Sequence, residues 1–249
     1  MTNLRYAQSL IDRLKRFELT TLVFFGILTG GALLFAMLAG EVVEGDTHAL
    51  DEAILLALRR SGDLGETIGP YWLTHAVQDI TSLGGVTVLS LMTLLTTAYL
   101  VISRRIRIAI FTACSILGGW LVSTALKVII ARPRPDIVPH LVDVRDLSFP
   151  SGHAMLSAVT YLTLGALLAR TQTTRATRLF MIAAALFLTL IIGLSRIFLG
   201  VHYPTDVLGG WCAGATWAVG CALVARSFVS AKPEPQRVHP KMDDSPANG

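Results

Sequence analysis

The stretch IAIFTACSILGGWLVSTAL, residues 108–126, holds 19 consecutive positions without Asp, Glu, Lys or Arg. A helix needs about 20 apolar residues to cross roughly 30 Å of hydrocarbon, so this stretch is long enough to span a membrane. Its apolar residues do not alternate with polar ones, as they would in a strand of a membrane barrel. Only helices and closed barrels satisfy their backbone groups inside lipid. We therefore predict a transmembrane helix here.

Further stretches of the same kind lie on both sides of this segment. They cover residues 19–40, 84–102, 152–169, 179–195 and 207–225. Of all residues, 53% are hydrophobic and only 15% are charged, which is outside the usual balance of a soluble domain. The first stretch is too long for the apolar part of a signal peptide, so we interpret it as a retained helix. The sequence predicts an all-α, polytopic membrane protein with six transmembrane helices in one bundle.

The domain organisation follows from where the apolar pattern stops. Residues 1–231 form one predicted membrane domain, and residues 232–249 make a polar tail interrupted by prolines. That tail has no apolar periodicity with which to build a core, so we expect a disordered cytoplasmic segment.

One amphipathic segment is predicted in the long loop between the first two spans. Leu50, Ile54 and Leu58 recur at four-residue intervals within residues 49–60, with charged side chains between them. This pattern indicates a helix that lies in the outer membrane interface with its apolar face toward lipid. A helix packed on the bundle explains the pattern equally well.

Basic residues are distributed unequally between the two sides of the predicted bundle. The N-terminus, the loops after the second and fourth spans, and the C-terminus share one side, and together they contain 14 of the 21 Lys and Arg residues. The other side contains 12 of the 17 acidic residues. By the positive-inside rule, both termini are expected in the cytoplasm. This orientation explains the net charge of +4 without a nucleic-acid partner.

The cysteines give no sign of a disulfide framework. Cys114, Cys212 and Cys221 all lie within predicted spans, at spacings typical neither of disulfides nor of a metal site. We interpret them as packing residues.

Three polar clusters stand at the ends of the predicted spans. They are KVIIARPRP at residues 127–135, PSGH at residues 150–153, and SRIFLGVHYPTD at residues 195–206. Counting spans places all three on the same side of the membrane, and the charge bias makes that side the outer one. The sequence therefore predicts a single site that contains all three clusters.

The residue types in these clusters suit phosphate. Lys127, Arg134 and Arg196 carry fixed positive charge, and the planar guanidinium of arginine matches the geometry of phosphate oxygens. Ser151 and Gly152 stand where the fourth span begins, and the free N–H groups of a helix N-terminus attract anions. Ser151 is the expected N-cap. We predict that these five residues bind phosphate.

Two histidines complete a set for phosphoryl transfer. His202 precedes Asp206 by four positions, so their side chains can meet on one face, with Pro204 suited to an early helical position. If Asp206 accepts the Nδ1 proton of His202, Nε2 is free to attack phosphorus. His153 is then the candidate general acid. These roles need no metal ion and no cofactor.

Each piece also has a simpler explanation. A basic residue at the end of a membrane helix is usually an anchor that reaches to the interface, and we interpret Arg132 and Arg145 in that way. The Pro-Ser-Gly sequence alone is an ordinary helix start. An isolated His-x-x-x-Asp is more often a hydrogen-bonded pair than a nucleophile, and a metal pair is also conceivable. The joint occurrence of the clusters favours the catalytic interpretation.

With these motifs the sequence resembles the type 2 phosphatidic acid phosphatase superfamily. The family signature K-x6-R-P, P-S-G-H and S-R-x5-H-x3-D is matched at every fixed position between Lys127 and Asp206. The resemblance implies a metal-independent phosphatase in which His202 is the nucleophile, His153 the general acid and Asp206 the partner of His202. It also implies that His153 and His202 contact phosphate together with the five residues named above.

The resemblance leaves the substrate open. Similar proteins act on phosphatidic acid, phosphatidylglycerol phosphate, undecaprenyl diphosphate, sphingoid phosphates or lipid A phosphates, and some transfer phosphate to another lipid. We favour undecaprenyl diphosphate or a phosphoglycerolipid in a bacterial inner membrane, with the site on the periplasmic face. Nothing in the sequence indicates an oligomeric state. The alternative from another class is a transporter of anionic lipids, although transporters place charged groups near the midplane of the membrane.

Overall fold

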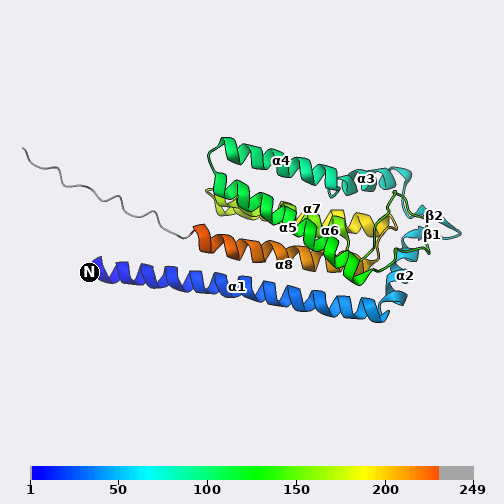
Figure 1. The fold of residues 1–249 in the computed structure, drawn as a ribbon, viewed down its shortest axis with the longest axis horizontal. Coiled ribbons are helices and arrows are strands. Elements are labelled where there is room, and N and C mark those ends of the chain that lie inside the picture. Colours follow the sequence, from blue (N-terminus) through cyan, green and yellow to red (C-terminus); the bar gives the residue numbers. More distant parts are fainter. Residues whose placement is uncertain (1, 230–249) are drawn as a thin grey trace, which may run out of the picture.

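A computed structural model describes residues 2–229 of the chain. This part forms eight helices and one two-stranded antiparallel sheet (Figure 1). The helices are α1 (Thr2–Glu44), α2 (His48–Ala57), α3 (Tyr71–Ser82), α4 (Val86–Ile102), α5 (Ile106–Ile130), α6 (Gly152–Thr171), α7 (Arg175–Phe198) and α8 (Pro204–Val229). The strands are β1 (Arg59–Arg60) and β2 (Asp63–Thr67). The tail predicted from Lys232 onward lies outside the described residues.

The chain is an integral membrane protein built from long apolar helices. Within the described residues, five helices are long and apolar enough to cross a membrane: α5, α6, α7 and the segments Thr21–Glu44 and Pro204–Ala225 of α1 and α8. The helix α4, with 17 residues, reaches spanning length only together with α3, from which it is bent by 44°. The predicted count of six spans therefore holds if α3 and α4 are one broken span.

The bend between α3 and α4 brings that connection against the core. A Cβ atom added at Gly84 would lie 2.4 Å from Ile192 and 3.3 Å from the His153 ring, closer than a side chain tolerates. Only glycine lets the backbone approach these residues so closely. The break in the helix is thus packed directly on the start of α6.

The helix α6 is the centre of the bundle. It packs against α7 and α8 and also contacts α4 and α5, while α1 lies along α8. At the contact with α8, a Cβ atom added at Gly210 would lie 2.8 Å from the Ser151 carbonyl oxygen and 2.9 Å from Ala154. This close approach fixes the first turns of α6 and α8 against each other, and both turns carry candidate site residues. On the outside, large apolar side chains remain exposed, including Leu33, Met37, Leu94, Tyr99 and Phe187.

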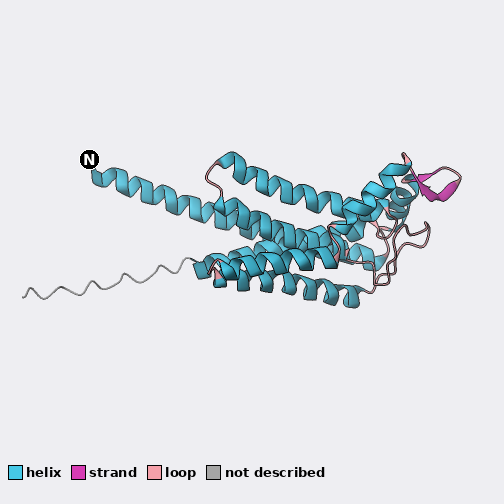
Figure 2. Cartoon of the chain, turned by 90° about the horizontal axis from the view of Figure 1, so that it is seen from above, coloured by secondary structure: helices cyan, strands magenta, loops and turns pink. Residues whose placement is uncertain are grey.

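The two ends of the bundle differ. The N-terminus of α1, the α4–α5 turn and the C-terminal end of α8 lie toward one end, and α2 and the hairpin lie at the other (Figure 1). Figure 2 shows the hairpin projecting beyond the helices at that second end. The arginine-rich loops and the polar clusters therefore lie at opposite ends, as the sequence predicts.

The outer loop differs from its prediction. The helix within residues 49–60 ends at Ala57, and Arg59 belongs to β1. The face that packs inward carries Asp51 and Leu55, both fully buried, whereas Leu50 is 64% exposed. The apolar pattern did not predict the burial of Asp51, because it does not reveal the buried polar partners of that carboxylate. The helix packs on the bundle, which is the second of the two interpretations.

Candidate active site

The three polar clusters meet at the end of the bundle that carries α2. Each comes from the end of a helix or from the loop beside it. Lys127 lies in the last turn of α5, Ser151 caps α6, Gly152 and His153 begin α6, Arg196 lies in the last turn of α7, His202 lies in the α7–α8 loop, and Asp206 lies in the first turn of α8.

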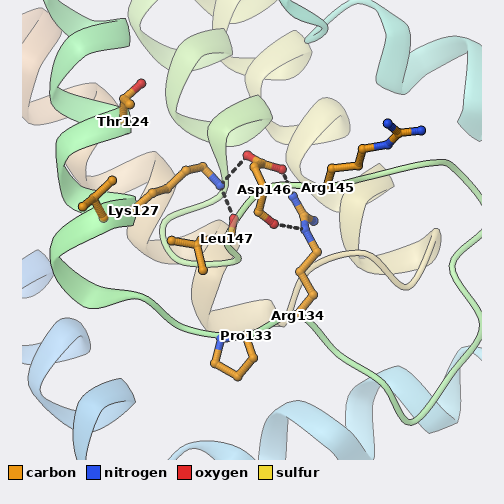
Figure 3. A pocket seen from close by; sticks show the side chains of 8 residues that line it. Thr124, Lys127, Pro133, Arg134, Arg145, Asp146 and Leu147 are labelled. Atoms are coloured by element: carbon orange, nitrogen blue, oxygen red, sulfur yellow. Dashed lines mark hydrogen bonds and ion pairs between the residues drawn. The ribbon is translucent and has the colours of Figure 1, made fainter.

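A pocket of about 320 Å³ opens beside Lys127 and Arg134. Figure 3 shows both side chains directed at the carboxylate of Asp146. The Nζ atom of Lys127 lies 2.9 Å from Asp146 Oδ2, and the Arg134 guanidinium forms an ion pair with Oδ1 of the same carboxylate. The Arg134 Nε atom also donates to the backbone carbonyl of Asp146 at 2.7 Å. Two cations are therefore held around one anionic group.

Asp146 is a residue that sequence reasoning missed. Burial alone would raise its pKa, but the hydrogen bond from Lys127 and the charges of Lys127 and Arg134 hold that pKa well below its usual value. The carboxylate is therefore ionised in this site. Its position in an irregular loop has no periodic or motif signal, so only the folded arrangement reveals it.

His202 is oriented by one partner on each ring nitrogen. Nε2 lies 3.1 Å from Arg134 Nη1, and Nδ1 lies 3.3 Å from Asp206 Oδ2. A guanidinium can only donate, so Nε2 must accept and the ring proton must sit on Nδ1, toward Asp206. Burial lowers the pKa of His202 well below its ordinary value, and the positive charges of Arg134 and Arg196 lower it further. The imidazole is therefore neutral, with its Nε2 lone pair on the side of the cations.

The N-terminus of α6 lies beside Lys127. Ser151 is the N-cap, as predicted, and its hydroxyl accepts from the Ala154 N–H at 3.5 Å. Its own N–H donates to the Asp206 carbonyl at 2.9 Å, which joins α6 to α8. A Cβ atom added at Gly152 would lie 3.5 Å from Lys127 Cε, so this backbone runs directly beside the lysine side chain. His153 is partly exposed and packs beside Gly84.

Arg196 is almost fully buried beneath the site. Its Nη1 atom donates to Thr81 Oγ1 at 3.0 Å, so the last turn of α3 holds it in place. The Nε atom is buried and has no hydrogen-bond partner in the described structure. Thr81 is a second residue that the motifs did not indicate.

The interpretation of Arg132 as an interfacial anchor was wrong. Its side chain is 4% exposed and forms ion pairs with Asp206 at 2.7 Å and with Asp51 at 2.8 Å. Burial alone would lower the pKa of Arg132, but the charge of Asp206 and the hydrogen bond to Asp51 raise it. Ala131 ends α5 in the left-handed conformation and turns the chain inward just before Arg132. Arg145 is different: its side chain is 89% exposed and lies 3.4 Å from Asp143.

Among residues 2–229, no group of three or more His, Cys, Asp and Glu side chains gathers in a way that could hold a metal ion. The positive charges that act on His202 include those of Arg134, Arg196 and Lys127.

Comparison with known proteins gives this arrangement a family. A family model described as the PAP2 superfamily matches residues 107–229, which include all three clusters. The phosphatidylglycerophosphatase B of Bacillus subtilis is 30% identical over 185 residues, covering 73% of this chain and 86% of that protein. The chain belongs to the PAP2 superfamily. The resemblance seen in the sequence motifs is thus confirmed.

A solved structure and one further relative extend the comparison. The crystal structure of the first transmembrane PAP2 type phosphatidylglycerolphosphate phosphatase from Bacillus subtilis matches with a TM-score of 0.75 and 26% identity, covering 83% of this chain and 100% of that one. The decaprenylphosphoryl-5-phosphoribose phosphatase of Mycobacterium tuberculosis is 37% identical over 102 residues, covering 38% of this chain and 49% of that protein. The PAP2 fold therefore extends beyond the segment that carries the motifs.

Proposed function

We propose that this PAP2 protein removes phosphate from a membrane lipid by attack of His202 on phosphorus. The chain is a membrane lipid phosphatase, as its family and its relatives indicate. The observation that carries the covalent mechanism is the orientation of His202, whose Nδ1 faces Asp206 and whose Nε2 faces Arg134. The Nε2 lone pair accepts from Arg134 Nη1, and a phosphate that takes over this donor would leave Nε2 free to attack phosphorus.

Phosphate binding comes first in this mechanism. Lys127 and Arg134 now hold the carboxylate of Asp146, an anion that a substrate phosphate would replace on the same donors. Arg196, Ser151 and the N–H groups at the start of α6 would hold the remaining equatorial oxygens. These fixed donors stabilise the charge that builds up on phosphorus in the transition state.

The chemical steps then balance without a metal ion. The His202 Nε2–P bond forms as the bond between phosphorus and the lipid oxygen breaks. His153, whose protonated form the negative charge of the bound phosphate would favour, donates a proton to that leaving oxygen. Asp206 stabilises the positive charge on the phosphorylated ring. Water then loses a proton to His153 and attacks phosphorus, the P–N bond breaks, and phosphate leaves with neutral His202 restored.

The pocket combines cations with an exposed apolar helix surface, and this combination favours a lipid bearing a phosphate or diphosphate head group. The pocket is lined by Thr124 and Val128 of α5 as well as by the cations, and Val128 is 68% exposed on the outside of a membrane helix. An acyl or polyprenyl chain can therefore lie along α5 while its head group reaches Lys127.

We favour a phosphoglycerolipid such as phosphatidylglycerol phosphate as the substrate, and undecaprenyl diphosphate is the alternative. The reason is that the matches to proteins named as phosphatidylglycerophosphatases extend over most of this chain and most of those proteins. Lipid A phosphatase or lipid-to-lipid transferase activity would use the same site.

We further propose that the site faces the periplasm of a bacterial inner membrane, with both termini in the cytoplasm. The arginine-rich α4–α5 turn lies at the end of the bundle opposite α2, in agreement with the positive-inside rule (Figure 1).

Phosphate release by the purified protein in detergent tests the proposal. The panel would contain phosphatidic acid, phosphatidylglycerol phosphate, undecaprenyl diphosphate and a lipid A phosphate. We expect release from at least one lipid, inhibition by vanadate, no loss of activity in chelator, and no release by His202→Ala. Activity that is lost in chelator and restored by Mg²⁺ would contradict the metal-independent mechanism.

A further inference from the structure

We propose that Arg132 and Asp51 are positioning residues for the His202–Asp206 pair, an inference that rests on the proposed function. Neither belongs to the fixed positions of the three motifs. Together with Asp206 they form a buried chain of alternating charge that connects the outer-loop helix α2 to the nucleophile.

The contacts of Asp206 show what Arg132 does. Oδ2 of Asp206 accepts from the Tyr203 N–H at 2.9 Å and from the Ser148 hydroxyl, and it faces His202 Nδ1 at 3.3 Å. Oδ1 is bound by Arg132 Nη1 at 2.7 Å. Arg132 therefore fixes the rotation of the carboxylate and keeps Oδ2 directed at the histidine.

Asp51 holds Arg132 and the start of α8 at the same time. Its Oδ2 atom accepts from Arg132 Nη2 at 2.8 Å and from the Thr205 hydroxyl at 2.5 Å, and its Oδ1 atom accepts from the Thr205 N–H at 3.1 Å. That N–H is one of the donors that a helix leaves free in its first turn. Asp51 thus anchors the turn that carries Asp206, although it lies 155 positions earlier in the chain.

The charges of Asp51, Arg132 and Asp206 matter as much as the contacts between them. On its solvent side, His202 faces the positive groups Arg134, Arg196 and Lys127, all of which oppose positive charge on the ring. Asp206 Oδ2, 3.3 Å from Nδ1, favours that charge when Nε2 bonds to phosphorus. A buried arginine paired with Asp206 alone would weaken this stabilisation, and Asp51 supplies the second negative charge that balances Arg132.

This arrangement separates binding from turnover. Lys127 and Arg134 bind phosphate from the other side of His202, so Arg132→Met and Asp51→Asn should leave KM within about 3-fold of wild type. We expect kcat to fall by about 10–100-fold in each, the usual effect of losing a group that orients a reacting side chain.

Arg60→Met and Glu52→Gln are the matched controls, because Arg60 is on the exposed hairpin and Glu52 is the chain neighbour of Asp51. Both controls should keep wild-type kcat.

A double-mutant cycle tests whether Arg132 acts through Asp206. If it does, Arg132→Met should cost less than about 3-fold when added to Asp206→Asn, because the group it positions is already lost. The unfolding midpoint of each variant is measured in detergent with and without vanadate. A rise in that midpoint on adding vanadate shows that the phosphate site is intact. Asp51→Asn is nearly isosteric, so it keeps the test decisive if Arg132→Met does not fold.

The outcomes are distinct. A wild-type protein that releases no phosphate from any lipid overturns the proposed function itself. With an active wild type, the inference is overturned if the two variants raise KM rather than lower kcat, if the losses from Arg132→Met and Asp206→Asn multiply, or if both single variants lose vanadate protection. The inference is supported if the single variants lower kcat with KM unchanged. It also requires that Arg132→Met cause less than about a 3-fold further loss of kcat when added to Asp206→Asn.

Discussion

The carboxylate of Asp146 lies 2.9 Å from the ammonium nitrogen of Lys127 and also pairs with the guanidinium of Arg134 (Figure 3). A protein anion therefore sits on two of the cations proposed to bind the substrate phosphate. The side chain of Asp146 is 62% exposed, so it can move aside into solvent without breaking the core.

Asp146→Asn should tighten phosphate binding. The substrate would no longer have to displace a charged competitor from Lys127 and Arg134, and a like charge would be removed from the site. We expect KM and the inhibition constant for vanadate to fall by about 2–10-fold, since partly exposed ion pairs contribute up to roughly 1 kcal/mol. Steady-state kinetics with increasing vanadate measures both values.

Asp143→Asn is the control, because Asp143 is an exposed acid in the same loop that pairs with Arg145 rather than with Lys127. A rise in KM in Asp146→Asn, with Asp143→Asn unchanged, would instead mean that Asp146 orients the cations for the substrate.

The sequence predicted those parts of the site that depend on local spacing. His202 and Asp206 are four positions apart and do meet, and Ser151 caps the helix that its neighbours predict. The same kind of reasoning failed for Arg132, whose partners Asp51 and Asp206 lie 81 and 74 positions away in the sequence. No periodic pattern reports a contact over such a separation.

The fold, like the site, was predicted well where a local sequence pattern determines it and less well where distant residues meet. Long uncharged stretches predict the membrane helices well, because each stretch satisfies its own backbone in lipid. The outer loop was predicted less well: α3 was not expected, and neither was the burial of Asp51 in α2. Its apolar residues Leu50 and Ile54 point outward, while buried Asp51 is satisfied by long-range polar contacts. Apolar periodicity cannot anticipate a buried carboxylate.

The proposed topology can be measured by labelling. A cysteine at Asp143, whose side chain is 79% exposed, should react with a membrane-impermeant thiol reagent in intact bacterial cells. A cysteine at exposed Thr173, in the α6–α7 turn, should react only after the cells are broken. The parent protein with Cys114, Cys212 and Cys221 replaced by alanine provides the background. The reverse pattern would place the site in the cytoplasm.

The neutral state of His202 should make folding stability depend on pH. The pKa of His202 is lower in the folded protein than its ordinary value of about 6.5, so the unfolded chain binds more protons below that pH. Stability is then lost as the pH falls below about 6.5, by up to about 1.4 kcal/mol per pH unit from this residue. The drop in unfolding midpoint between pH 7.5 and 5.0 in detergent should be smaller in His202→Asn. Equal drops in both proteins would show that His202 is not held neutral by the fold.

The role proposed for His153 predicts a dependence on the leaving group. General acids contribute about 10²–10⁴-fold, and they matter least when the leaving oxygen departs easily by itself. His153→Ala should therefore lose much more activity on a lipid phosphomonoester, which expels an alkoxide, than on a lipid diphosphate, which expels a phosphate. Comparison of kcat/KM for phosphatidic acid and undecaprenyl diphosphate measures this difference. An equal loss on both substrates would remove His153 from the role of acid.

The most direct test of the covalent mechanism is to trap phosphate on His202. Substrate labelled with ³²P at the scissile phosphate is mixed with the enzyme and quenched rapidly at alkaline pH, where a phosphohistidine survives. We predict acid-labile label on the wild-type protein, more label on His153→Ala because hydrolysis of the intermediate is slowed, and neither label nor turnover in His202→Ala. Absence of label from wild type and from His153→Ala, together with appreciable phosphate release by His202→Ala, would contradict attack by His202 and establish direct attack by water.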